Sequence, residues 1–331
     1  MRTFDCCCGN SLFFHSTYCI SCNRNTGMCP ACNRVVPVIE EVDGICRCGN
    51  PDCGVEVTQC FNGETNDFCN RLVVKAELEN LCDYCTLTTV IPDMPIAGNY
   101  EKWKRLEQAK QRVLYLLDQI GLEFRGVDEN SEPTLSFEFK ADAEKPVTTG
   151  HKNGCITINI READSVERER SRVELQEPQR SLIGHFRHEL GHFFWDRLVR
   201  GDREVAFRVL FGDERTPTYK EALTNYYQKG PALNWTSNFI SAYATMHPWE
   251  DFAETFSAYL DMASVVDTAT HFGVTDSGIQ DFDAMLKSYS RVGLIANEFN
   301  RDMGLLDLVP QVFVQPVVEK LRFVHGLRKE V

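Results

Sequence analysis

Residues 188–192 read HELGH, with His188 and His192 at its ends. On a helix, side chains four positions apart share one face, so both imidazoles can bind one metal ion. Glu189 lies next to them and can take a proton from a water molecule on that ion. Apolar residues recur around the motif, and Ser181 stands where a helix cap is expected. The stretch therefore predicts a buried helix that carries half of a metal site.

A second acidic stretch, HPWEDFAE at residues 247–254, supplies the missing ligand. Pro248 suits the first turn of a helix, which puts Glu250 and Glu254 one turn apart on the same face. We expect Glu250 to be the third ligand and Glu254 to hydrogen-bond a ligand histidine. The alternative is two carboxylates on a solvated helix face. That alternative explains poorly why the acids stand among aromatic residues, because buried carboxylates need partners.

The front of the chain is rich in cysteine: fourteen of the fifteen cysteines precede residue 86. In a chain whose start lacks a secretory signal, such crowding indicates metal binding rather than disulfide bonds. Each expected zinc site has four thiolate ligands and no open position, which is typical of structural zinc. A segment of this size with few long apolar runs cannot fold without the free energy of metal binding, about 10 kcal/mol or more for each site.

The spacing of the cysteines predicts two or three structural zinc sites. The three expected sets are Cys6, Cys8, Cys19 and Cys22; Cys29, Cys32, Cys46 and Cys48; and Cys60, Cys69, Cys82 and Cys85. Cys53 can replace Cys46 or Cys48 in the second set. Cys7 and Cys155 have no set.

Composition and charge limit the kinds of partner. The net charge is -13, and residues 1–90 contain six Lys and Arg against eleven Asp and Glu. Zinc-bound thiolates add further negative charge, so we expect no nucleic-acid partner. No apolar run approaches the roughly 20 residues needed to cross a bilayer, so we expect no membrane contact. The absence of an apolar signal core after Met1 predicts a cytoplasmic protein.

The fold class expected is α+β. We expect a cysteine-rich zinc-ribbon or rubredoxin-like module at residues 1–92 and a mainly helical, zincin-like domain at residues 99–331, as suits a chain of 331 residues. Pro92, Pro95 and Gly98 mark the linker. Apolar periodicity predicts a helix over residues 100–120, and alternation predicts strands at residues 134–140 and 155–160, which form a small sheet.

The sequence resembles known zinc peptidases. The two motifs together are similar to the gluzincin branch, and the FAE segment ending at Glu254 is similar to the anthrax lethal factor type. Nearly the whole chain resembles a bacterial family of zinc-binding metallopeptidases with an N-terminal zinc ribbon. The segments that carry this resemblance are FDCCCGN at residues 4–10, GHFRHELGH at 184–192, FGDE at 211–214, SAYA at 241–244 and HPWEDFAE at 247–254. The family implies a reaction class and no substrate.

Three further residues are candidates for a role near the metal. In the resembled group, a tyrosine seven residues before the glutamate ligand assists the oxyanion, and Tyr243 occupies that place; packing is the alternative. His247 can stabilise the transition state or cap the helix that follows. Asp251 can orient a ligand histidine as a neighbour of the metal ligands.

The expected function is a zinc-dependent hydrolase, a metallopeptidase that cleaves an amide bond in a peptide or protein substrate. It would use one catalytic zinc besides the structural ones, with Glu189 as general base. The alternative is a binding scaffold that recruits a protein partner through its zinc-ribbon module, with a vestigial or regulatory metal site. The intact pairing of HExxH with ExxxE favours chemistry.

Overall fold

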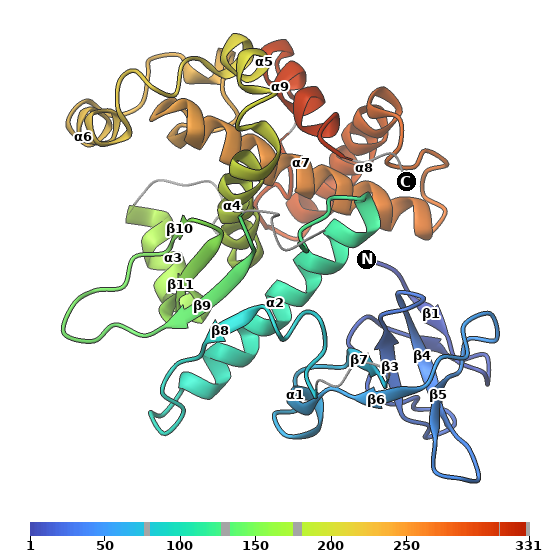
Figure 1. Ribbon diagram of the computed structural model, residues 1–331. Helices are drawn as coiled ribbons and strands as arrows, with labels where there is room; N and C mark the ends of the chain where they lie inside the picture. Colours follow the sequence, from blue (N-terminus) through green and yellow to red (C-terminus); the bar gives the residue numbers. More distant parts are fainter. Residues whose placement is uncertain (76–79, 127–132, 175–180, 311, 329–331) are drawn as a thin grey trace. The chain divides into compact units, whose positions relative to one another are not determined.

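The structure is a computed structural model, and it describes residues 1–75, 80–126, 133–174, 181–310 and 312–328 (Figure 1). It divides into two compact units. The first comprises residues 1–112, 136–147 and 159–164, and the second comprises residues 113–135, 148–158 and 165–331. The division falls inside the long helix α2 (Asn99–Ile120). The domain boundary expected at residues 92–99 stays a prediction about independently folding domains.

The cysteine-rich part of the first unit consists of short antiparallel strands. Those found in the described residues before 76 are β1 (Phe4–Asp5), β2 (Ser11–Leu12), β3 (Thr26–Cys29), β4 (Arg34–Glu40), β5 (Cys46–Cys48), β6 (Val57–Gln59) and β7 (Leu72–Val74). They pair as β1 with β2, as β3-β4-β5, and as β6 with β7. This part, followed by a mostly helical remainder, confirms the α+β class.

The strand register brings cysteines to the ends of hairpins. Cys29 pairs with Arg34 across β3 and β4, so Cys32 lies in the tight turn between them. Cys48 pairs with Val38 across β4 and β5. Short loops of this kind turn two thiols of one knuckle toward a common point.

An apolar cluster lies around these hairpins. It consists of Val36, Val57 and Leu72 together with the buried side chains of Cys29 and Cys48. Cysteine side chains thus form part of the buried surface, and metal binding by such cysteines adds to the folding free energy that apolar burial supplies.

The rest of the first unit includes α1 (Phe61–Glu64), β8 (Thr88–Val90), β9 (Ser136–Lys140), the first part of α2 and a 3-10 turn at Ile160–Ala163. Strand β8 runs parallel to β9. Lys110 of α2 is fully buried, and its Nζ lies 2.7 Å from a carboxylate oxygen of Glu107 and 2.6 Å from the Thr88 hydroxyl. These bonds satisfy the buried charge. The strand expected at residues 134–140 is confirmed.

A β-hairpin belongs to the second unit. Strand β10 (Gly150–Lys152) pairs antiparallel with β11 (Cys155–Asn159), which confirms the expected strand at residues 155–160. The turn between them uses Asn153 at φ 50° and Gly154 at φ 83°. A Cβ atom on Gly154 would lie 2.2 Å from the Thr134 carbonyl oxygen, so glycine is required there.

Helices make up most of the second unit. They are α3 (Ser165–Glu174), α4 (Leu182–Phe194), α5 (Glu204–Phe211), α6 (Tyr219–Lys229), α7 (Pro248–His271), α8 (Phe282–Asp302) and α9 (Gln315–His325). A π-helical turn at Trp195–Val199 extends α4, and 3-10 turns occupy Trp235–Ser237 and Tyr243–Thr245. None of the helices in the described residues is long and apolar enough to cross a membrane.

Helix α7 is the centre of this unit. It packs against α4, α5, α8 and α9, and Figure 1 shows it passing beside α4. Gly191 of α4 faces Ala253 of α7 at close range. A Cβ atom on Gly191 would lie 2.7 Å from the Ala253 Cα atom, which is closer than any packing allows. The small residue thus lets the two motif-bearing helices touch.

Candidate metal centre

Helix α4 presents the two histidines of the HELGH stretch. The Ser181 hydroxyl accepts a hydrogen bond from the Gly184 amide at 2.9 Å and fixes the start of the helix, as expected. The rings of His188 and His192 lie one turn apart with centroids separated by 4.9 Å. Both imidazoles therefore point to the same side of α4.

Helix α7 presents Glu250 to these rings. Pro248 is at the start of the helix, so Glu250 falls in its first turn. Oxygen Oε2 of Glu250 lies 3.0 Å from Nε2 of His188 and 3.5 Å from Nε2 of His192. Zinc bonds of about 2.1 Å at tetrahedral angles place neighbouring ligand atoms about 3.4 Å apart. Two imidazole nitrogens and one carboxylate oxygen at these separations fit a zinc ion with a further position open.

Glu254 orients His188 from the side opposite Glu250. Its Oε1 lies 2.6 Å from Nδ1 of His188, and its Oε2 accepts a hydrogen bond from the Ser241 hydroxyl at 2.7 Å. Burial alone would raise the pKa of Glu254, but the contacts with His188 and Ser241 lower it. An ionised Glu254 requires the proton of His188 on Nδ1, which leaves Nε2 free to bind metal.

Tyr219, which neither sequence motif contains, holds Glu250. The Tyr219 hydroxyl donates a hydrogen bond to Oε1 of Glu250 at 2.8 Å. Although burial opposes ionisation, the neighbouring histidines hold the pKa of Glu250 well below its usual range. The carboxylate therefore has one oxygen for Tyr219 and one for the metal position.

Glu189 lies beside this cluster on α4. Its side chain is buried, and within the described residues its Oε2 has no hydrogen-bond partner. A buried carboxylate oxygen without a partner costs free energy, and a catalytic role is one reason for accepting that cost. Its position suits the expected general base, although this role stays a prediction.

Aromatic rings surround the ligands. The Trp249 ring lies over His192 with centroids 3.7 Å apart, and Tyr219 contacts Trp249 at 5.8 Å. The Tyr243 ring lies 6.2 Å from that of His188. These rings restrict the ligand side chains to few orientations and lower the local dielectric, which strengthens the electrostatic interactions inside the site.

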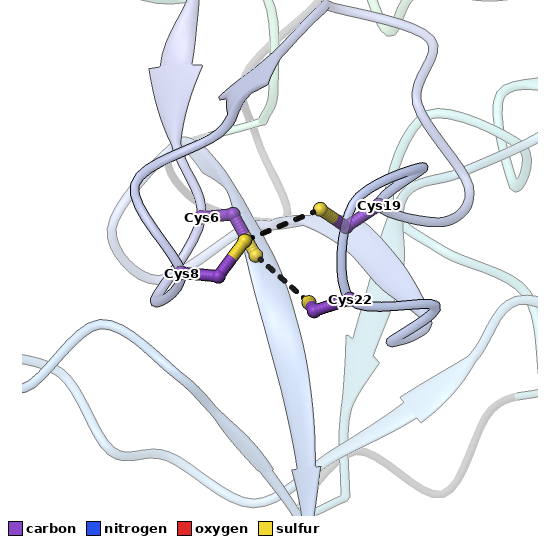
Figure 2. Close-up of side chains that lie close together, drawn as sticks. All are labelled: Cys6, Cys8, Cys19 and Cys22. Carbon is purple, nitrogen blue, oxygen red and sulfur yellow. Dashed lines mark hydrogen bonds between the residues drawn. The ribbon is translucent and has the colours of Figure 1, made fainter.

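The first cysteine set gathers around one point (Figure 2). Sulfur atoms lie 3.6 Å apart both between Cys6 and Cys22 and between Cys8 and Cys19. Zinc–sulfur bonds of about 2.3 Å at tetrahedral angles place sulfur atoms about 3.8 Å apart, whereas a disulfide bond is about 2.05 Å long. All four thiols are free, and the geometry fits a four-thiolate zinc site.

The second set differs from the expected one in a single member. The structure groups Cys29, Cys32, Cys48 and Cys53, and Cys46 is not in the group. The Cys48–Cys53 segment folds back because the amides of Cys53 and Gly54 both donate to the Asn50 carbonyl. Cys46 lies two residues earlier in β5, opposite Glu40 and away from the knuckle turn. The assignment of Cys46 is thus corrected in favour of Cys53, the alternative left open by the spacing.

The third set has the expected members, Cys60, Cys69, Cys82 and Cys85. All four are buried, and the sulfur atoms of Cys69 and Cys82 lie 3.6 Å apart. The buried guanidinium of Arg71 binds Asp83 of the last knuckle and also Asn33, which follows Cys32. Arg71 therefore links the second and third sets and supplies positive charge beside the thiolates.

Comparisons with known proteins agree with these sites. A family model described as "Putative zinc-binding metallo-peptidase" matches residues 99–327, and a zinc-ribbon domain model matches residues 3–96. The chain belongs to this zinc-binding metallopeptidase family. The resemblance to a family of zinc-binding metallopeptidases with an N-terminal zinc ribbon is therefore confirmed, and so is the assignment of zinc to the protein.

Curated relatives of the chain occur in mycobacteria. Uncharacterized proteins of Mycobacterium bovis and Mycobacterium tuberculosis are each 35% identical to it over 343 residues. The alignments cover 100% of this chain and 96% of each relative. No solved structure matches the chain.

Tyr243 and His247 both lie near the candidate metal site, but they differ in their contacts. Burial, together with the charge of Glu250, raises the pKa of Tyr243, so its phenol stays protonated and can donate a hydrogen bond. Nδ1 of His247 accepts a bond from the Trp249 amide at 3.2 Å, and Nε2 lies 3.0 Å from the Glu214 carbonyl oxygen. With both nitrogens bound to backbone, the geometry favours the capping alternative for His247.

Asp251 does not orient a ligand histidine, which corrects that expectation. Its Oδ2 lies 2.6 Å from Nζ of Lys320 in α9, and both side chains are buried. Successive residues of a helix point about 100° apart, so Asp251 leaves the face that Glu250 and Glu254 share. The pair instead connects α7 with α9.

Residues that complete the centre come from distant parts of the chain. Tyr219 lies within a TxxE capping signal, residues 218–221, that predicts a helix start but not where the helix lies. Ser241 belongs to the SAYA segment, whose resemblance to the family was the one available signal. No sequence pattern indicated that Lys320 is buried, because a single lysine in an amphipathic helix is usually solvated.

We predict that Cys53→Ser removes one zinc ion per chain and that Cys46→Ser removes none. The reason is that Cys53 completes the second four-thiolate group and Cys46 does not. Elemental analysis of the purified variants measures this difference. Zinc loss from Cys46→Ser with full retention in Cys53→Ser would contradict the assignment.

We predict that Lys320→Met lowers the free energy of unfolding by about 3–5 kcal/mol, because it leaves Asp251 buried without its cation. Arg322→Met is the matched control: Arg322 lies in the same helix and pairs with Asp283 at the exposed surface, so the loss should stay below about 1 kcal/mol. Denaturant unfolding measures both values. Equal losses of unfolding free energy would contradict the claim that the buried Lys320–Asp251 pair stabilises the fold more than the exposed Arg322–Asp283 pair.

Proposed function

We propose that the protein is a zinc-dependent peptidase that hydrolyses an amide bond. The observation that carries the proposal is the convergence of His188, His192 and Glu250 on one point beside the buried Glu189. Three protein ligands with an open fourth position are typical of catalytic zinc, whereas the four-thiolate groups are closed and suit structural zinc. We therefore propose one catalytic and three structural zinc ions.

The side chains around the centre have separate roles in this proposal. Zinc, when bound, supplies a Lewis acid that polarises the substrate carbonyl and makes water nucleophilic near neutral pH. Glu189 takes the proton from the attacking water and passes it to the leaving nitrogen. Tyr243 donates a hydrogen bond to the developing oxyanion. Glu254 keeps the Nδ1 proton on His188 throughout, and so preserves its orientation.

Strand β10 offers a place for an extended peptide. It packs against α4, the helix that carries the HELGH stretch. It is an edge strand, since β11 is the one described strand that pairs with it. Main-chain groups of such a strand can add a peptide as a further strand and hold it beside the metal. This arrangement favours a peptide or protein as the substrate class.

The proposal also concerns the cellular compartment and the kind of partner. The crowded free thiols suit a reducing compartment, which favours the cytoplasm. The acidic zinc-ribbon region is proposed to meet proteins rather than nucleic acids, because it offers few cations for phosphate groups.

We predict that Glu189→Gln keeps the zinc content of the parent and loses activity by about 100-fold or more, since general-base catalysis typically contributes at least this factor. Digestion of a peptide library, read by mass spectrometry, identifies a substrate and measures the loss. Elemental analysis provides the zinc control. A Glu189→Gln variant as active as the parent would remove Glu189 from the mechanism.

We also predict that His188→Ala and Glu250→Gln each contain one zinc ion fewer per chain. Each change removes one of three ligands at an open site, and the thiolate sites keep their metal. Elemental analysis after dialysis against a mild chelator is the measurement. Unchanged zinc in both variants would contradict the proposed catalytic site.

A further inference from the structure

The start of α6 is fixed by its own sequence. Thr218 caps the helix: its hydroxyl accepts a bond from the Glu221 amide, and the Glu221 carboxylate accepts one from the Thr218 amide in return. This reciprocal capping box determines where the first turn begins. Tyr219 is therefore the first helical residue, and its direction follows from the placement of the cap.

The loop before α6 is tied to the helices of the metal centre. The Glu214 carboxylate binds the Arg208 guanidinium of α5, with one nitrogen-to-oxygen distance of 3.0 Å. The Glu214 carbonyl lies 3.0 Å from Nε2 of His247, the cap of α7. These bonds hold the loop against the start of α7. They bring the first residue of α6 over Glu250.

Tyr219 makes a contact with Glu250 that core packing does not explain. In α6 only Ala222 is buried, and the Tyr219 side chain is 38% exposed. Its ring nevertheless contacts the rings of His247 at 5.4 Å and Trp249 at 5.8 Å. Its hydroxyl lies 2.8 Å from Oε1 of Glu250. A ring that is 38% exposed contributes little to the core, so core packing does not explain the direction of its hydroxyl.

The hydroxyl meets a specific need of Glu250. That side chain is only 2% exposed, and a buried carboxylate needs a partner for each oxygen. Oε2 faces the two imidazoles. Among the described residues, the Tyr219 hydroxyl is the one group besides those histidines that hydrogen-bonds the Glu250 carboxylate. Without it, Oε1 would lack a partner and could rotate toward the ring nitrogens.

We propose that Tyr219 is a positioning residue, whose hydroxyl holds Oε1 of Glu250 so that Oε2 alone serves as the zinc ligand. The inference rests on the proposed role of Glu250 in the catalytic zinc site. It assigns to α6 a part in metal binding that neither sequence motif contains. Partners that hold metal ligands in this way typically change metal affinity 10- to 100-fold (roughly) when they are removed.

The test compares Tyr219→Phe with Tyr227→Phe. Both variants lose one hydroxyl from α6, but Tyr227 is 70% exposed and does not contact Glu250. Zinc binding to the catalytic site is measured by titration against a competing chelator, on protein whose thiolate sites remain loaded. We expect the dissociation constant of Tyr219→Phe to rise by roughly 10- to 100-fold, and that of Tyr227→Phe to equal the parent's. At saturating zinc, Tyr219→Phe should contain as much metal as the parent.

A parent-like dissociation constant for Tyr219→Phe would overturn the inference. If activity is then low at saturating zinc although the affinity is unchanged, Tyr219 acts on the substrate and not on Glu250. The Glu250→Gln variant separates this inference from the proposed function. If that variant keeps all its zinc, the proposed site itself fails, whatever the result for Tyr219.

Discussion

The contact between α4 and α7 at Gly191 and Ala253 is the constraint on which the metal centre depends. These residues each precede a functional side chain, namely His192 in α4 and Glu254 in α7. Because a Cβ atom on Gly191 would clash with the Ala253 backbone, the helices can approach this closely only with glycine there. A larger residue would push the two helices apart and so move the imidazoles away from Glu250.

The first turns of α7 show how one helix serves several partners. Glu250 and Glu254 lie on one face and contact the histidines, while Asp251 points to Lys320 of α9. Each buried carboxylate thus has its own cation or hydrogen-bond donor, which is the condition for burying it. The same helix places the metal ligand and fastens the surrounding helices.

In the first unit, we expect zinc to stabilise the fold rather than to take part in a reaction. Its cysteine sets lie at hairpin ends where four sulfur atoms approach to about the spacing that zinc requires. Metal binding there adds to the folding free energy that the buried apolar side chains supply. Arg71, which binds groups of two knuckles, connects the sets through the protein as well as through charge.

The sequence by itself determined the local elements and the main ligands: the helix with His188 and His192, the helix start at Pro248 that places Glu250 in the first turn, and most of the cysteine sets. Caps, periodicity and ligand spacing act over a few residues, so they can be read along the chain. Only the tertiary structure decided that Cys53 replaces Cys46, that Asp251 binds Lys320 and that Tyr219 reaches Glu250. These choices depend on how separate elements pack, and no interaction between neighbours in sequence encodes such contacts.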